Sequence, residues 1–111
     1  MMRDNQSLYD ILDSAKLAVL YIANKSKQEF LSDLQCQDAV ILRIIIIGEA
    51  SNRISEETQT QFNKLPWRQM IGMRNLVVHQ YDDINLNIIW DTVNNDLPKL
   101  IRELEKLFET R

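Results

Sequence analysis

The side chains best suited to chemistry lie together in the middle of the chain, in the stretch MIGMRNLVVHQYDD at 70–83. This stretch contains Arg74 and His79, which is the only histidine among the 111 residues. Metal-independent cleavage of RNA needs a base for the 2′-hydroxyl, an acid for the leaving 5′-oxygen and a cation for the phosphate. An imidazole and a guanidinium supply these groups, so Arg74 and His79 are candidate catalytic residues. The alternative interpretation is a histidine that only makes hydrogen bonds at a helix end.

A helix over 66–79 has to position these two residues. Pro66 suits its first turn, where a missing N–H costs no hydrogen bond. At 100° per residue, Arg74 and His79 point about 140° apart on a straight helix, so they cannot share a face. Two arrangements remain open. Either the helix ends or distorts near Val78 and lets His79 turn toward Arg74, or the two side chains meet groups from another helix or subunit.

Apolar residues at helical spacing predict two helices before this stretch begins. An amphipathic helix is expected over 8–23, with polar residues on its outer face. Ser26 and Glu29 have the spacing of a capping box, which satisfies two backbone N–H groups at the start of a helix. A short helix is therefore expected from Ser26 through about Leu34.

The run QDAVILRIIIIGEASNRISEE predicts a long buried helix over about 36–60. Its β-branched residues would also suit a buried strand, but the apolar pattern continues beyond them and no partner strand is evident. Because the helix is apolar on more than one face, a partner subunit is expected to cover the second face, which predicts a homodimer. Arg43, inside the apolar run, is expected to pair with a carboxylate, either Glu49 or one across the dimer.

Asn85 is expected to cap a last helix over about 86–108. Pro98 falls inside it and should kink the helix without ending it, because the apolar period resumes in phase afterwards. Together the helices predict an all-α fold, an up-and-down bundle of four main helices plus a short one, in a single domain over 1–111.

Composition limits the classes of protein to consider. The chain is 45% hydrophobic and 26% charged with only two Gly and two Pro, which favours helices. Its net charge of −3 argues against broad electrostatic coating of nucleic acid, although residues 43–81 carry five Lys or Arg against three Asp or Glu. A single cysteine, no apolar leader and no membrane-length run predict a soluble cytoplasmic protein. Arg53, Lys64 and Arg68 are candidates to line an RNA approach, or ordinary solvated charges.

Several motifs occur in a recognisable order. RNLVVHQY at 74–81 reads as R-x-x-x-x-H-x-Y, and it follows an apolar helix with Arg43 and IIGEA at 46–50, then PW at 66–67. The last helix contributes a tryptophan and the sequence NDLP at 95–98. Over most of the chain these motifs resemble the HepT-like toxins, a branch of the HEPN (higher eukaryotes and prokaryotes nucleotide-binding) superfamily.

The resemblance implies a homodimeric HEPN-like bundle with a ribonuclease site at the subunit cleft, acting as the toxin of a type VII toxin–antitoxin pair. Arg74 and His79 match the catalytic pair, Asn75 the position of a polar helper, and Glu49 a position facing the cleft. Tyr81 matches the tyrosine that the cognate minimal nucleotidyltransferase antitoxin modifies with AMP. The implied partners are RNA, this antitoxin and a second copy. No cofactor, metal, membrane or DNA partner is implied.

Two other functions stay open alongside a metal-independent ribonuclease toxin. One is a non-catalytic HEPN module that binds nucleotides or RNA, in which Arg74 and His79 only hold phosphates. The other is a partner subunit whose helical surface docks a nucleotidyltransferase. The sequence leaves open which RNA is cut, whether tRNA or mRNA, how many AMP units are added and the stoichiometry with the antitoxin.

Overall fold

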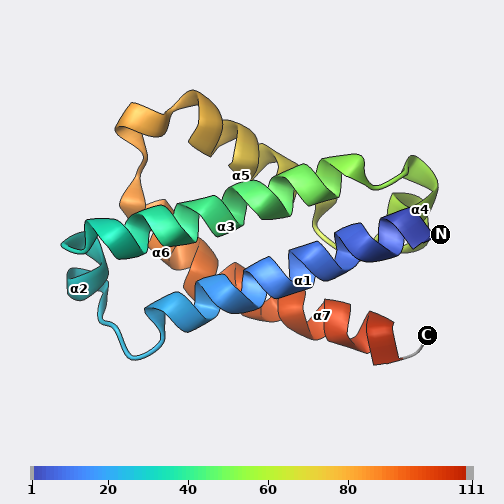
Figure 1. Cartoon of the computed structure of the whole chain (residues 1–111), viewed down its shortest axis with the longest axis horizontal. Helices are drawn as coiled ribbons and strands as arrows, with labels where there is room; N and C mark the ends of the chain where they lie inside the picture. Colours follow the sequence, from blue (N-terminus) through green and yellow to red (C-terminus); the bar gives the residue numbers. More distant parts are fainter. Residues whose placement is uncertain (1, 110–111) are drawn as a thin grey trace.

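The fold is known from a computed structural model that describes residues 2–109, except for the side chains of residues 2, 3 and 81. Every regular element in this part of the chain is helical, which confirms the all-α prediction (Figure 1). The elements are α1 (Met2–Ile22), α2 (Lys27–Leu31), α3 (Leu34–Arg53), α4 (Glu56–Gln61), α5 (Trp67–His79), η1 (Tyr81–Asp83), α6 (Leu86–Asp91), η2 (Thr92–Asp96) and α7 (Leu97–Glu109). None of the described helices is long and apolar enough to cross a membrane.

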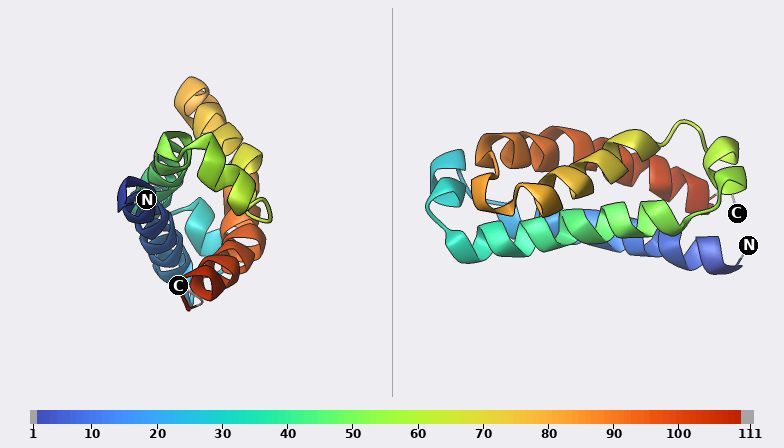
Figure 2. Two further views of the ribbon diagram at one scale, coloured as in Figure 1. Left: turned by 90° about the vertical axis from the view of Figure 1, so that its right-hand side faces the viewer. Right: turned by 90° about the horizontal axis from the view of Figure 1, so that it is seen from above.

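The long helices run up and down beside one another, and α3 is the central element. It packs against α1 on one side and α5 on the other, while α1 also packs against α7. The end of α5 leans away from the rest of the bundle, which is clearest in the end-on view of Figure 2. Consequently α5 contacts the body of the protein chiefly through α3.

Local capping explains where several helices begin, as the sequence predicted. The backbone N–H of Ser26 donates to Glu29 Oε1 at 2.8 Å and the N–H of Glu29 donates to Ser26 Oγ at 3.1 Å, which completes the capping box of α2. Asn85 Oδ1 accepts from the N–H of Asn87 at 3.0 Å and caps α6. Asn24 adopts the left-handed conformation, φ 67°, just beyond the end of α1.

The predicted long helix over about 36–60 is not continuous, because it breaks after Arg53. α3 ends at Arg53, Ile54 is extended, and Ser55 caps the separate helix α4 by accepting from the N–H of Thr58 at 3.2 Å. The buried carboxylate of Asp4 at the start of α1 fixes this break. It accepts from Ser55 Oγ at 2.8 Å and from Thr58 Oγ1 at 2.6 Å. A contact between residues more than 50 positions apart therefore decides where the helix stops.

The last helix continues through Pro98, as predicted, but by way of a π-helical turn. Residues Thr92–Asp96 form η2 between α6 and α7, and the N–H of Leu97 donates to the carbonyl of Thr92. Pro98 has no N–H for the carbonyl four residues earlier, and a wider turn just before it accommodates that loss. The π turn faces α5, so it contributes to the surfaces described below.

The core lies where the inner faces of these helices meet. Cys36 is buried, as expected for a small apolar side chain, and burial raises the pKa of its thiol. Trp67 is also buried and donates from Nε1 to the carbonyl of Phe62 at 3.0 Å. On α3, four β-branched residues are buried within the chain, but Leu42 is 49% exposed, so the outer face of this helix is not covered. The four are Val40, Ile41, Ile44 and Ile47.

Candidate active site

The candidate site begins at a close crossing of α3 and α5. Gly48 on α3 lies against Arg74 on α5, and a Cβ added to Gly48 would stand 2.1 Å from Arg74 Cβ and 3.0 Å from the carbonyl oxygen of Met70. Only a residue without a side chain permits this approach. The other glycine, Gly72, has nothing within 4 Å of an added Cβ. Gly48 is therefore the residue that lets α3 reach the base of the Arg74 side chain.

Glu49 follows Gly48 and holds the guanidinium. Arg74 Nε donates to Glu49 Oε1 at 2.6 Å and Arg74 Nη2 lies 2.5 Å from the same oxygen. On the other side, Arg74 Nη1 donates to Asn75 Oδ1 at 2.8 Å. The Nε edge is thus occupied, while N–H bonds on Nη1 and Nη2 remain for another acceptor. The Arg74 side chain is 31% exposed, so a phosphate can reach these groups.

Glu49 is therefore the partner of Arg74. The sequence analysis had named Glu49 as one possible partner of Arg43, and that pairing is wrong. Arg43 Nη1 instead donates to Ser14 Oγ on α1 at 3.5 Å, and its buried Nε has no hydrogen-bond partner among the described residues. The expected pairing of Arg43 with a carboxylate of the same chain is thus wrong for this part of the protein. Helical spacing explains the difference, because Glu49 lies on the α5 side of α3.

His79 does not join Arg74 within the chain. α5 stays helical through His79, with the N–H of Gln80 bonded to the carbonyl of Leu76, so the distortion near Val78 that one of the two arrangements requires does not occur. His79 is exposed, and its imidazole makes no hydrogen bond to another described residue. It stands about 7.5 Å along the helix axis from Arg74 and about 140° around it. Of the two arrangements open from the sequence, the one that needs groups from another helix or subunit remains.

Asn75 lies between the two candidate catalytic residues on the helix surface. It is about 100° around the helix from Arg74 and about 40° from His79, which is four residues later. Its amide oxygen already accepts from Arg74. Tyr81 begins η1 directly after α5, so its backbone is two residues from His79, but its side chain lies outside the described part of the structure. The exposed carboxylates of Asp82 and Asp83 complete this turn.

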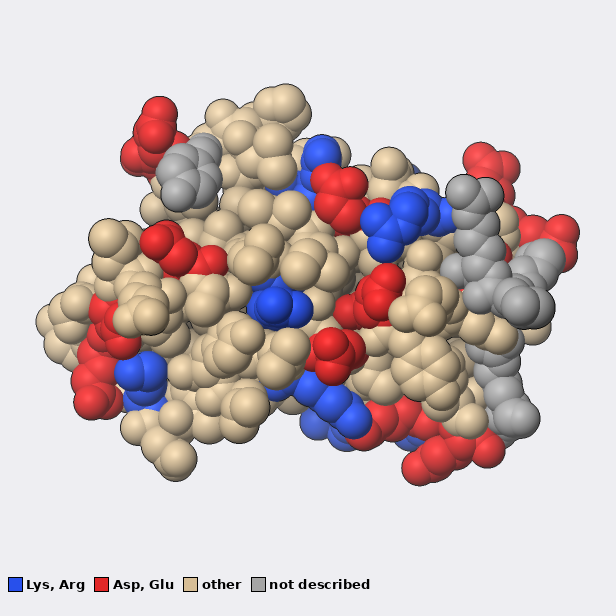
Figure 3. Space-filling model, in the orientation of Figure 1, with Lys and Arg blue, Asp and Glu red and all other residues tan. Residues whose placement is uncertain are grey.

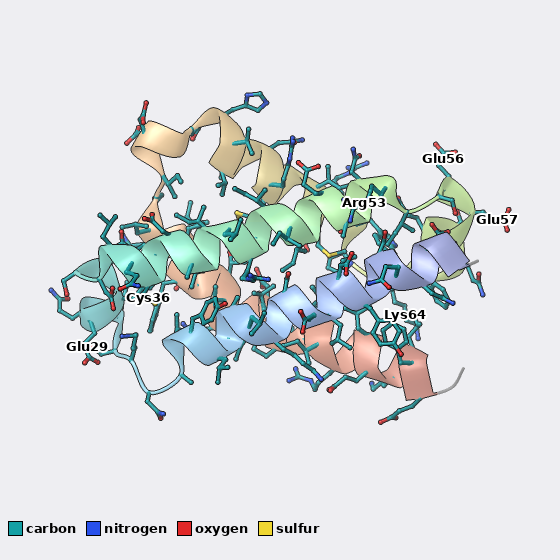
Figure 4. All side chains as sticks on the ribbon, viewed as in Figure 1. Glu29, Cys36, Arg53, Glu56, Glu57 and Lys64 are labelled. Atoms are coloured by element: carbon teal, nitrogen blue, oxygen red, sulfur yellow. The ribbon has the colours of Figure 1, made fainter. Side chains whose placement is uncertain are left out.

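Charge on the surface is mixed. On the face drawn in Figure 3, Lys and Arg alternate with Asp and Glu and form no continuous basic area. Arg53 pairs with Asp10 at 3.6 Å, and Figure 4 places Arg53 and Lys64 toward the α4 end of the bundle, while His79 ends α5 at that helix's opposite end. Among the described residues, no group of three or more His, Cys, Asp or Glu is placed to hold a metal ion.

Comparison with known proteins shows what this arrangement belongs to. A family model described as ribonuclease HepT-like matches residues 11–107, a region that contains all the site residues named above. The chain belongs to the HepT-like family of the HEPN superfamily. This confirms the resemblance drawn from the sequence motifs. No solved structure matches the chain.

Individual relatives of this HepT-like chain carry ribonuclease names. It is 37% identical over 98 residues to "Putative RNase MJ1380" of Methanocaldococcus jannaschii, covering 88% of this chain and 90% of that protein. It is 35% identical over 100 residues to "Probable ribonuclease HepT" of Thermococcus cleftensis, covering 90% and 91% of the two chains. A third relative, "Putative RNase TTE0752" of Caldanaerobacter subterraneus, is 28% identical over 102 residues, 92% and 91% of the two chains.

Sequence reasoning missed the part played by Gly48. The residue stood inside the motif IIGEA, but a glycine in a helix gives no sign of which neighbour approaches it. The available signal was scarcity: the chain has two glycines, and a helical glycine costs roughly 1 kcal/mol relative to alanine. Such a residue in a buried helix points to a close packing contact.

Proposed function

We propose that this HepT-like chain is a metal-independent endoribonuclease, the toxin of a HEPN/MNT toxin–antitoxin pair. It would act as a homodimer with its site at the subunit interface, and its cognate minimal nucleotidyltransferase would silence it by attaching AMP to Tyr81. The family membership supports the ribonuclease class. The observation that carries the site is the fixed guanidinium of Arg74, held by Glu49 and Asn75 with two N–H bonds left for a phosphate.

The chemistry needs two proton transfers at one phosphodiester. The 2′-oxygen attacks phosphorus as its proton passes to one imidazole, and the bond from phosphorus to the 5′-oxygen breaks as a second imidazole gives that oxygen a proton. The products are a 2′,3′-cyclic phosphate and a 5′-hydroxyl. Arg74 stabilises the extra negative charge of the transition state from a prearranged position. One chain has only His79, so a second copy of the chain supplies the second imidazole.

The uncovered surface beside Arg74 supports the dimer. Leu42 lies two turns before Glu49 on the same face of α3, and Val78 lies one turn after Arg74 on α5. These two side chains are 49% and 42% exposed. A second copy packed here would bury both and bring a second His79 toward the site, since the two faces of an isologous interface are the same surface. Monomeric protein with full activity would contradict this arrangement.

The decisive assay is cleavage of RNA by the purified unmodified protein in excess EDTA. We expect cleavage with 2′,3′-cyclic phosphate ends, no cleavage of DNA of the same sequence, and loss of roughly three orders of magnitude in rate for Arg74→Ala or His79→Ala. Activity that survives His79→Ala, or that disappears in EDTA and returns with a divalent metal, would overturn the proposal. Tight RNA binding without turnover would favour the non-catalytic HEPN module.

Mixing subunits tests whether the site needs two copies. When wild-type and His79→Ala chains are unfolded, mixed equally and refolded, about one quarter of random dimers contain two wild-type chains. If both imidazoles are needed, activity falls to that quarter. If each chain works alone, activity falls only to one half, and the shared site is wrong. Circular dichroism of the variant alone checks that it still folds and competes.

AMP attachment at Tyr81 would silence the enzyme through charge and bulk. A phosphodiester and a nucleoside two residues from His79 would repel an RNA phosphate and occupy its space. Incubation with the partner nucleotidyltransferase, ATP and Mg²⁺ should add mass in AMP steps and stop cleavage. Tyr81→Phe should gain no mass and should stay active with the partner present. A mass gain in the phenylalanine variant would place the modification on another residue.

A further inference from the structure

A groove runs along one side of α5, between this helix and α6. Three adjoining hollows form it. The first and the middle hollow share Gln69, Met73, Thr92 and Asp96, and the middle and the last hollow share Ile88. One wall is α5 with its flanking residues Pro66 and Gln80, and the opposite wall is α6 with the π turn and the start of α7. Ile44 and Ile47 of α3 also line the first hollow. The middle hollow has a volume of about 520 Å³ and the one nearest His79 about 240 Å³. We call this the α5–α6 groove.

The chemistry of the α5–α6 groove is apolar inside and acidic at its edge. Leu76 and Ile88 are 40% and 43% exposed, although both are large apolar side chains. The ionisable residues among those lining the three hollows are Asp83, Asp91 and Asp96, all exposed, and no Lys or Arg lines any of them. Exposed apolar surface of this kind, rimmed by polar groups, is typical of a protein-binding site.

The acidic edge selects among possible occupants. An RNA backbone would be repelled by three carboxylates with no cation to neutralise its phosphates. A second copy bound symmetrically through the same groove would bring Asp91 and Asp96 of both chains together, which is unfavourable. A partner that presents apolar side chains flanked by Lys or Arg would pack against the apolar interior of the groove and pair with the carboxylates at its edge.

We propose that the α5–α6 groove docks a basic amphipathic helix of another protein. The α5 wall is about 21 Å long, which matches roughly 14 residues of a helix laid along it. Apolar residues at positions i, i+3 or i+4, and i+7 of the partner would contact Met73, Leu76 and Ile88, and its flanking cations would face Asp91 and Asp96. The residues of α5 that line the groove centre about 120° around the helix from Arg74, and Arg74 lines none of the three hollows. The partner would therefore contact the helix that carries the candidate site without covering Arg74.

The methionines of the chain make the groove directly observable. Met70 and Met73 both line it, and they are two of only four methionines in the chain. The probe is a synthetic 14-residue helix with leucines on one face and lysines beside them. The matched control peptide replaces each lysine with glutamate. Full-length protein labelled with ¹³C in the methionine methyl groups is titrated with each peptide, and Met73→Leu assigns one signal.

We expect the basic peptide to shift the Met70 and Met73 signals saturably, with an affinity that falls as salt is added, and the acidic peptide to leave them unchanged. No binding, or equal binding of both peptides, would contradict the proposal. An RNA oligonucleotide that shifts the same signals would show that the groove is an RNA surface. Shifts that appear on raising the protein concentration alone would show a second copy in the groove.

Paired variants distinguish peptide binding in the groove from non-specific binding elsewhere on the surface. Leu76→Ser should weaken peptide binding about tenfold, while Leu20→Ser, which alters an exposed leucine of α1, should leave it unchanged. Asp91→Lys combined with Asp96→Lys should weaken it at least about fivefold, while Asp13→Lys on α1 should not. Because all of these side chains are exposed in part or whole, the variants should fold. Equal effects at groove and control positions would refute the assigned site.

Discussion

Replacing Gly48 with alanine tests the closest packing contact of the candidate site. The new Cβ would stand 2.1 Å from Arg74 Cβ, whereas ordinary contact begins at 3.4 Å. α3 and α5 would have to separate by about 1.3 Å to relieve this one contact. Overpacking of this severity costs about 3 kcal/mol, offset by about 1 kcal/mol because alanine favours a helix more than glycine does. The net loss in the free energy of unfolding is about 2 kcal/mol, or roughly 8 °C in Tm.

Gly72→Ala is the matched control, because Gly72 also lies inside a helix, in this case α5, but has open space around an added Cβ. Here only the gain in helix propensity remains, so thermal unfolding should occur about 4 °C higher than in wild type. Differential scanning calorimetry or circular dichroism measures both variants. If Gly48→Ala were as stable as Gly72→Ala, the close crossing of α3 and α5 would be wrong.

The same substitution should disturb the candidate site. The hydrogen bond from Arg74 Nε to Glu49, 2.6 Å long, is made by the residue next to Gly48. A separation of about 1.3 Å stretches it beyond hydrogen-bonding distance. Ribonuclease activity measured well below the unfolding temperature should therefore fall in Gly48→Ala by more than the unfolded fraction explains. Full activity in a folded Gly48→Ala protein would refute the inference that the crossing positions Arg74.

Three further changes have defined outcomes. Hydrogen bonds from Thr58 and then Ser55 to the Asp4 carboxylate hold its pKa below the usual 3.8, against the effect of burial. Asp4→Asn should therefore lower the free energy of unfolding, measured in urea, by about 2 kcal/mol above pH 5. The loss should become smaller as the pH falls through the lowered pKa. Glu49→Gln should change Tm by no more than about 3 °C, because the ion pair is partly exposed, yet lower RNA cleavage about tenfold by leaving Arg74 loosely held. Asn85→Ala should lower Tm by about 4 °C through loss of the α6 cap.

Each of these has a control on the same kind of surface. Asp13→Asn on α1 should be as stable as wild type at all pH values where Asp4→Asn differs. An equal cost of Asp4→Asn at pH 3 and pH 7 would show that the stabilisation does not come from the carboxylate. Asn87→Ala, one turn or less from Asn85 but without a capping role, should leave Tm unchanged. Activity of Glu49→Gln equal to wild type would remove Glu49 from the site.

Local signals made most of the fold predictable, and long-range contacts account for the errors. Helical periodicity and the caps at Ser26 and Asn85 depend on residues within one or two turns of each other, so they can be read from short stretches. The break after Arg53 cannot, because the carboxylate that holds Ser55 comes from Asp4. An apolar residue at 54 continued the helical period, and nothing local showed that Ile54 would be extended.

The candidate site divides in the same way. Arg74, Asn75 and His79 could be identified because motif and helix lie in one continuous segment. The partner of Glu49 could not, since the choice between Arg43 and Arg74 depends on which side of α3 faces α5. The angle between Arg74 and His79 was predictable from helical geometry alone. The group that faces His79 was not, because the imidazole is exposed and makes no hydrogen bond or ion pair with a described residue.

The attachment of α5 links the candidate site to whatever binds the chain. α5 is held near its middle by the contact of Gly48 with Arg74 and by the Glu49–Arg74 pair, whereas its C-terminal end leans away from the bundle and exposes Val78 on one face and Leu76 on another. Arg74 lies at the crossing with α3, and His79 is the last residue of α5. Because Arg74 and His79 belong to one continuous helix, whatever packs against its C-terminal end acts on the position of both side chains relative to the bundle. The two candidates are a second copy on the Val78 side and a basic helix in the α5–α6 groove. A ligand that binds only one position of α5 would shift the protein toward that position, and so would raise or lower cleavage without touching Arg74.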